Sequence, residues 1–127
     1  MSATILLVDD SSTTLLMEEM LFKKYTKFSI VTAADGAEAV QKALAERPNL
    51  ILMDVVMPKM DGFEACRAMR KTDALRDVPI ILVTSRGEPC NMRTGFDSGC
   101  NNYLTKPVNG RDLLDMVSRY LASQEVS

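Results

Sequence analysis

Four short polar segments of this 127-residue chain carry side chains that could do chemistry. They are Asp9-Asp10, Asp54, Thr84-Ser85 and Lys106-Pro107. Each segment directly follows a run of apolar residues. Carboxylate oxygens are ligands for hard cations such as Mg²⁺, which commonly binds one or two carboxylates together with phosphate oxygens. These residue types therefore indicate a site for a divalent cation and an anion, provided that the fold brings them together.

The absence of histidine narrows the chemistry further. The chain has 17 acidic and 15 basic residues but no histidine. Ser-His-Asp and Cys-His catalysis, histidine metal ligands and a phosphohistidine are therefore excluded. Oxygen ligands favour Mg²⁺ or Ca²⁺ over zinc and copper. Cys66, Cys90 and Cys100 form no CxxC pair, so we interpret them as core or surface residues in a reducing compartment.

The composition indicates one soluble globular domain that spans residues 1–127. The chain is 46% hydrophobic and 25% charged, with a net charge of -2. These values argue against disorder and against a broad nucleic-acid footprint. No apolar run approaches the ~20 residues of a membrane span, and the N-terminus lacks the pattern of a signal peptide. We therefore expect a cytoplasmic protein without membrane association or direct nucleic-acid binding.

Short apolar runs alternate with helical patterns along the whole chain. The runs are Ile5–Val8, Phe28–Thr32, Leu50–Met53, Ile80–Val83 and Asn102–Thr105. This alternation predicts βαβ units and a parallel sheet, hence an α/β fold. The first, third and fourth runs are continuously apolar, as in central strands, whereas the second and fifth contain the polar residues of edge strands. The simplest right-handed arrangement is a doubly wound sheet of order 2-1-3-4-5.

Two helical segments carry specific expectations. The helix after the first strand has an apolar stripe and a serine cap, at Leu16, Met17, Met20 and Leu21 and at Ser11 or Ser12. The segment between the fourth and fifth strands is rich in glycine, with Gly87, Gly95 and Gly99. Because glycine costs ~1 kcal/mol against alanine in a helix interior, we expect a short or loose helix there.

The predicted sheet brings the four polar segments to one edge. Ligands of such sheets bind outside the carboxyl ends of the strands, at the switch point between the first and third strands. Asp9, Asp10 and Asp54 flank that point. Two unit charges about 4 Å apart repel by ~4 kcal/mol at an effective dielectric of ~20. Three carboxylates together therefore need a cation, the ammonium of Lys106 or a proton for relief, and Mg²⁺ fits.

Four motifs at these positions resemble one known family. They are ILLVDDSS, LILMDVVMPKMDGFE, PIILVTS and NNYLTKP. In sequence and spacing they are similar to the response-regulator receiver domains of bacterial two-component signalling, and the resemblance covers essentially the whole chain. It implies a flavodoxin-like (βα)5 fold with a five-stranded parallel sheet. It also implies a phosphoacceptor signalling domain that is not an enzyme but assists its own phosphorylation and dephosphorylation.

The resemblance assigns a role to each site residue. Asp54 is expected to accept the phosphoryl group. Asp9 and Asp10 are expected to hold Mg²⁺ together with Asp54 and the backbone carbonyl of Val56. Lys106 would pair with the Asp54 carboxylate or with the phosphoryl group.

The resemblance also implies a switch. Thr84 would hydrogen-bond a phosphoryl oxygen, and Tyr103 would rotate to report the state to the outer face. The Lys106–Pro107 peptide bond is expected to be cis. Val56 and Arg86 would tune the lifetime of the phosphoaspartate.

The phosphoryl donor implied by the resemblance is a phosphohistidine on a sensor histidine kinase or a histidine phosphotransfer protein. The expected partner face consists of the fourth helix, fifth strand and fifth helix, and it would bind a downstream protein or form a phosphorylation-dependent dimer. Three alternatives stay open: a degenerate receiver that only binds proteins, a flavodoxin-like cofactor protein, and an aspartate-nucleophile phosphatase. The phosphatase would need a second acid where Val56 stands. A flavodoxin-like phosphate loop would need a glycine after the first strand, where none is present, and Asp9 and Asp10 would repel a phosphate without a metal.

Overall fold

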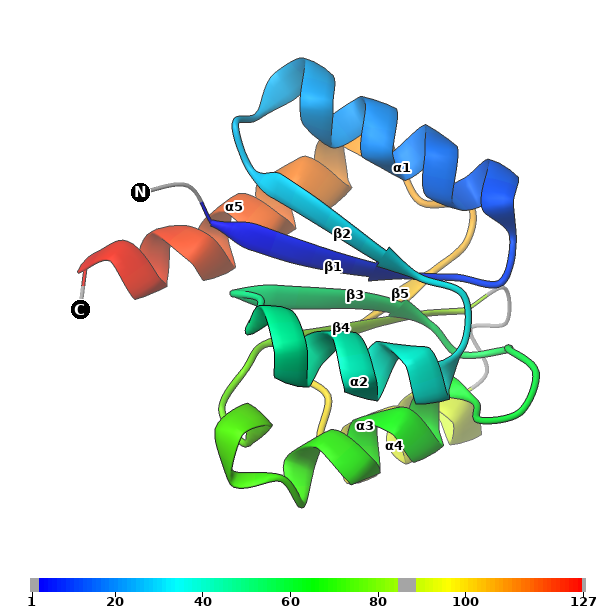
Figure 1. Ribbon diagram of the computed structural model, residues 1–127. Helices are drawn as coiled ribbons and strands as arrows, with labels where there is room; N and C mark the ends of the chain where they lie inside the picture. The colour runs from blue at the N-terminus through cyan, green and yellow to red at the C-terminus, as the bar shows by residue number, and fades with distance from the viewer. Residues whose placement is uncertain (1–2, 85–88, 127) are drawn as a thin grey trace.

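The computed structural model describes residues 3–84 and 89–126. Five parallel strands form one sheet of order β2-β1-β3-β4-β5, which confirms the predicted fold class and strand order. Helices α1 and α5 cover one face of this sheet, and α2, α3 and α4 cover the other (Figure 1). The strands are β1 (Thr4–Val8), β2 (Ser29–Ala33), β3 (Leu50–Asp54), β4 (Ile80–Thr84) and β5 (Asn102–Thr105).

The helices follow the strands as the alternation predicts. They are α1 (Ser12–Tyr25), α2 (Gly36–Glu46), α3 (Gly62–Arg70), α4 (Pro89–Asp97) and α5 (Gly110–Val126). A 3-10 turn at Asp73–Leu75, which the sequence analysis did not predict, lies between α3 and β4. Helix α4 is short, with nine residues. Within the described ranges, no helix is long and apolar enough to cross a membrane.

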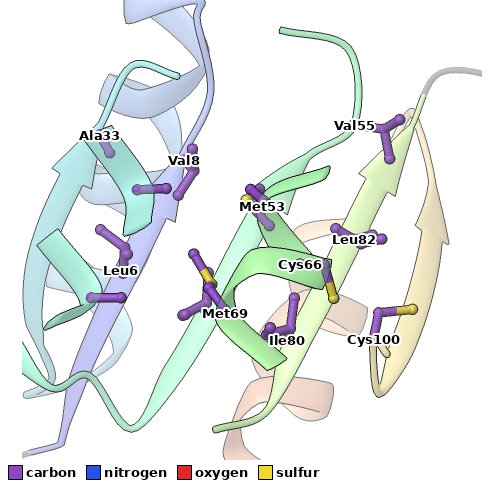
Figure 2. Packing of buried hydrophobic residues seen from close by; sticks show 14 of the residues in the cluster. Leu6, Val8, Ala33, Met53, Val55, Cys66, Met69, Ile80, Leu82 and Cys100 are labelled. Atoms are coloured by element: carbon purple, nitrogen blue, oxygen red, sulfur yellow. The ribbon is translucent and has the colours of Figure 1, made fainter. Parts of the chain in front are cut away.

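Each face of the sheet has its own hydrophobic core. Because side chains alternate along a strand, Leu6 and Val8 point to the α2/α3/α4 side, whereas Ile5 and Leu7 point to the α1/α5 side. Figure 2 shows the first of these cores, in which Cys66 and Cys100 lie among apolar side chains. Strands β3 and β4 are buried along their whole length, as expected for central strands covered on both faces.

The packed side of helix α1 differs in part from the apolar stripe that the sequence predicts. Leu16, Met17 and Met20 are 57%, 66% and 61% exposed. The side of α1 that packs on the sheet instead carries Phe22, which is fully buried, with Leu15 and Leu21 at its flanks. The prediction was right for Leu21, which packs on this side, and wrong for Leu16, Met17 and Met20. The apolar residues of this helix cover more than one face, so periodicity alone did not identify the packed one. The cap is Ser11, whose side chain accepts a hydrogen bond from the Thr14 amide.

Candidate phosphorylation site

The three predicted carboxylates meet at the carboxyl edge of the sheet. Strands β1 and β3 are neighbours, with Val8 paired to Met53, so the residues that follow them lie side by side. One carboxylate oxygen from each of Asp9, Asp10 and Asp54 lies within 4.8 Å of the others. Asp9 and Asp54 are buried and Asp10 is exposed. This arrangement could hold a metal ion at the mouth of the crevice.

Backbone contacts hold Asp9 in place. Its amide donates to the Ala33 carbonyl oxygen at 3.1 Å, which ties it to the end of β2. Its Oδ1 accepts a hydrogen bond of 2.9 Å from the Ser11 amide. Its Oδ2 faces Lys106, whose Nζ lies 3.4 Å away. The carboxylate is therefore oriented by the turn into α1 on one side and by a cation on the other.

Lys106 bridges the two buried acids. Its Nζ lies 3.4 Å from Asp9 Oδ2 and 3.5 Å from Asp54 Oδ1. Its amide donates to the Thr84 carbonyl oxygen, and the following peptide bond to Pro107 is cis. Burial lowers the pKa of Lys106, but the charges of Asp54 and Asp9 outweigh burial, so the pKa lies above its usual value. Lys106 therefore stays cationic.

Burial and a neighbouring negative charge both act on the Asp54 carboxylate. Burial, and then the negative charge of Asp9, raise the pKa of Asp54 to about 6, although Lys106 opposes the rise. One ammonium thus compensates three clustered carboxylates incompletely. A hard divalent cation with oxygen ligands would complete the compensation, so the donor set fits Mg²⁺.

The loop after β3 is held tightly beneath the site. The Gly62 amide donates to the Val55 carbonyl oxygen at 2.8 Å. A Cβ atom at Gly62 would lie 2.6 Å from the Asp54 backbone oxygen, so no larger residue fits without displacing the Asp54 backbone. Val56, whose carbonyl was predicted as a metal ligand, lies in this loop with its side chain exposed.

The two predicted switch residues lie on adjacent strands. Thr84 ends β4 and is buried, and it pairs in register with Thr105 of β5. Tyr103 is also buried, with its ring against α4, where a Cβ atom at Gly95 would lie 2.8 Å from Tyr103 Cδ2. Tyr103 thus points toward the α2/α3/α4 core. Arg86 lies outside the described residues.

The response regulator receiver domain family matches residues 5–118. The chain belongs to this family. Protein PilH of Pseudomonas aeruginosa is 35% identical over 120 residues, which are 94% of this chain and 98% of PilH. The alkaline phosphatase synthesis transcriptional regulatory protein PhoP of Bacillus subtilis is 32% identical over 127 residues, and this chain covers 52% of it. The receiver domain thus spans about half the length of several curated relatives that it matches.

Solved receiver structures resemble this one closely. The chemotaxis protein CheY4 of Vibrio cholerae superposes with a TM-score of 0.88 at 34% identity, over 94% of this chain and 99% of that one. The receiver domain of the sensor histidine kinase PA1611 of Pseudomonas aeruginosa has a TM-score of 0.88 at 30% identity, over 96% and 99% of the two chains. That structure has a magnesium ion coordinated in its active site cleft.

One charged residue near the receiver site was missed by the sequence analysis. Glu18 of α1 has a pKa of about 7, raised by burial first and by the charges of Asp9 and Asp54. A signal was present in the sequence, because Glu18 stands four residues after Thr14 and three before Leu21, on one side of the helix. It was overlooked because the stripe of methionine and leucine suggested a different packed face.

Proposed function

We propose that residues 1–127 act as one receiver domain that takes a phosphoryl group onto Asp54 in the presence of Mg²⁺. The donor is a phosphohistidine on a cytoplasmic sensor histidine kinase or histidine phosphotransfer protein. The observation that carries this proposal is the cluster in which Lys106 Nζ lies 3.5 Å from Asp54 Oδ1 and bridges it to Asp9. Membership of the receiver family supports it.

Asp54 is the nucleophile in this proposal. A carboxylate oxygen of Asp54 forms a bond to phosphorus while the P–N bond to the donor histidine breaks, and the electron pair of that bond remains on the imidazole nitrogen. With a pKa of about 6, Asp54 is mostly ionised at neutral pH and can attack. The ammonium of Lys106, already near Asp54, offsets the charge of the incoming phosphoryl oxygens.

The metal site uses the same acids. Asp9, Asp10 and Asp54, with the Val56 carbonyl, would hold Mg²⁺, in keeping with the acid cluster. When bound, Mg²⁺ supplies the positive charge that offsets repulsion between carboxylate and phosphoryl oxygens. The chain's own contribution is to hold these oxygens together before the donor arrives.

The response to phosphorylation runs through Thr84 and Tyr103. The Thr84 hydroxyl donates to a phosphoryl oxygen, and Tyr103 then leaves its place against Gly95. Its departure changes the face made of α4, β5 and α5, where Phe96 is already half exposed. We expect a downstream protein, or a second copy of the domain, to bind this face.

The switch has a direct spectroscopic test. Phosphorylation is expected to shift the backbone amide resonances of residues 89–105 in NMR spectra, whereas residues 36–46 of α2 serve as an internal reference. Amide shifts confined to the immediate surroundings of Asp54 would contradict the proposed coupling. Size-exclusion chromatography of the phosphorylated protein distinguishes a dimer from a monomeric messenger.

Phosphorylation itself is tested with a small donor. We expect incubation with acetyl phosphate and Mg²⁺ to add one phosphoryl group to the intact protein, as measured by mass spectrometry. Asp54→Asn should gain none, whereas Asp77→Asn, an exposed substitution of the same kind, should behave as the wild type. A folded wild type that neither gains mass nor binds Mg²⁺ would contradict the proposal.

A further inference from the structure

Glu18 occupies an inward position on α1. Leu16 and Met20, two residues before and after it, are apolar and exposed. Glu18 itself is partly buried, between Thr14 one turn before it and Leu21 one turn after it. A charged residue therefore stands on the side of the helix that faces the protein, while apolar residues face solvent.

This side of α1 borders a groove that reaches the phosphorylation site. The groove has a volume of about 630 Å³ and is lined from α1, from the end of β4 and from the connection into α5. Glu18 and Lys106 both line it, among the apolar side chains of Leu21, Val83 and Leu113. Apolar walls reduce the screening between charges that lie along them.

The Glu18 carboxylate acts on the phosphorylation site through its charge. Within residues 3–84 and 89–126, it makes no hydrogen bond and no ion pair. It does interact electrostatically with three members of the site, through repulsion by Asp9 and Asp54 and attraction by Lys106. Three carboxylates, those of Asp9, Asp54 and Glu18, therefore act on one ammonium.

We propose that Glu18 is a positioning residue of the phosphorylation site, whose negative charge strengthens Mg²⁺ binding to the acid cluster and opposes the approach of an anionic phosphoryl donor. This inference rests on the proposed function, because it assumes phosphorylation at Asp54. Glu18 contacts neither the metal nor the phosphoryl group directly. It acts through its negative charge and by attracting the ammonium of Lys106. Glu18 thus competes with Asp54 and the phosphoryl oxygens for this ammonium.

The two effects of the Glu18 charge have opposite signs. Attraction favours a divalent cation, so removing the charge weakens metal binding. Repulsion disfavours a donor phosphate, so removing the charge speeds phosphorylation once the metal site is saturated. A loss of structure at this position would instead weaken both properties together. Weaker Mg²⁺ binding together with faster phosphorylation therefore indicates an effect of charge and not of packing.

The test compares Glu18→Gln with two matched variants at pH 8. Glu18→Asp keeps the charge, and Glu19→Gln removes one charge from the adjacent residue, which pairs with Lys23 instead of lining the groove. Mg²⁺ affinity is measured by isothermal titration calorimetry. The rate constant for phosphorylation by acetyl phosphate is measured separately at saturating Mg²⁺.

We expect Glu18→Gln to raise the Kd for Mg²⁺ by roughly three- to tenfold and to raise the phosphorylation rate constant by roughly two- to fivefold. Glu18→Asp and Glu19→Gln should stay within about twofold of wild type in both measurements. Glu18→Gln values within about twofold of wild type, or a decrease in both affinity and rate, would overturn the proposal. If the wild type is not phosphorylated at all, the failure lies with the proposed function, and the Mg²⁺ titration still tests Glu18.

Discussion

The Asp54 carboxylate is buried beside a like charge, and this placement makes stability depend on pH. Its pKa rises from 3.8 in the unfolded chain to about 6 in the fold. The folded state therefore binds the proton more tightly, so the stabilisation from protonated Asp54 is complete below pH 3.8 and is lost as the pH rises through about 6. Above that pH, the ionised side chain destabilises the metal-free fold.

Asp54→Asn should therefore stabilise the metal-free protein at pH 8. We expect a gain of roughly 1–3 kcal/mol in the free energy of unfolding, which shrinks toward zero at pH 4. Urea denaturation in EDTA at the two pH values measures it. Asp77→Asn, an exposed change of the same kind, is the control. A gain of equal size at both pH values would point to packing and not to the buried charge.

Gly95 gives a second prediction at the residue scale, because Tyr103 fills the space beside it. Alanine in a helix is usually favoured over glycine by ~1 kcal/mol. Here the added Cβ would lie 2.8 Å from the Tyr103 ring, so we expect Gly95→Ala to lower the free energy of unfolding by roughly 1–2 kcal/mol. In a Tyr103→Ala background, the same change should be stabilising. An equal effect in both backgrounds would contradict the proposed contact.

At the scale of elements, hydrogen bonds from Arg70 connect several segments at the edge of the sheet opposite the phosphorylation site. Arg70, at the end of α3, donates hydrogen bonds to the carbonyl oxygens of Gly99 and Leu75 at 2.8 and 3.0 Å. It also donates to Asn101 Oδ1 at 2.7 Å, and that oxygen accepts a further bond from the Ile80 amide. The guanidinium thus links α3 to the turn before β4 and to the connection between α4 and β5.

Arg70→Met should loosen this junction. We expect the free energy of unfolding to fall by roughly 2–3 kcal/mol, since the part-buried carbonyl oxygens of Gly99 and Leu75 lose their donor. Amide hydrogen exchange should increase most in residues 99–103. Arg67→Met, on the exposed side of the same helix, should change neither quantity measurably. Exchange that increases uniformly over the chain would show that Arg70 stabilises the domain without a local role.

The elements also show what periodicity can and cannot predict. The five strands were located from short runs of residues to within a residue or two. The signal is clearest for β1, β3 and β4, because burial on both faces leaves a continuous apolar run. The packed face of α1 was not identified, because methionine and leucine are exposed there while Glu18 faces inward. That choice depends on how the helix docks against α5 and the sheet, which no local pattern encodes.

At the scale of the whole molecule, the convergence of distant residues follows from topology. Residues 9, 54 and 106 are far apart in sequence, but parallel strands put their ends at one edge, so their meeting was predictable. The distances, the raised pKa of Asp54 and the charge of Glu18 in the groove were not predictable. They depend on burial and on the combined charges of side chains from the ends of three strands and from helix α1.

Mg²⁺ should couple this site to global stability. A ligand that binds only the folded state raises the free energy of unfolding, by ~2.7 kcal/mol at a hundred times its Kd. We therefore expect Mg²⁺ to raise the Tm of the wild type and to reverse the order of stability between wild type and Asp54→Asn at pH 8. Calorimetry with Mg²⁺ and with Na⁺ at matched ionic strength separates binding from screening. A Tm that responds equally to both salts would argue against a metal site.

The most direct measurement locates the phosphoryl group covalently. After reaction with acetyl phosphate and Mg²⁺, borohydride reduces an acyl phosphate to an alcohol, so a phosphorylated aspartate becomes homoserine and peptide mass spectrometry records its position. The proposal predicts homoserine at position 54 and at no other aspartate. Homoserine at another position, or none in a protein that has gained a phosphoryl group, would contradict the assignment of Asp54 as the phosphoacceptor.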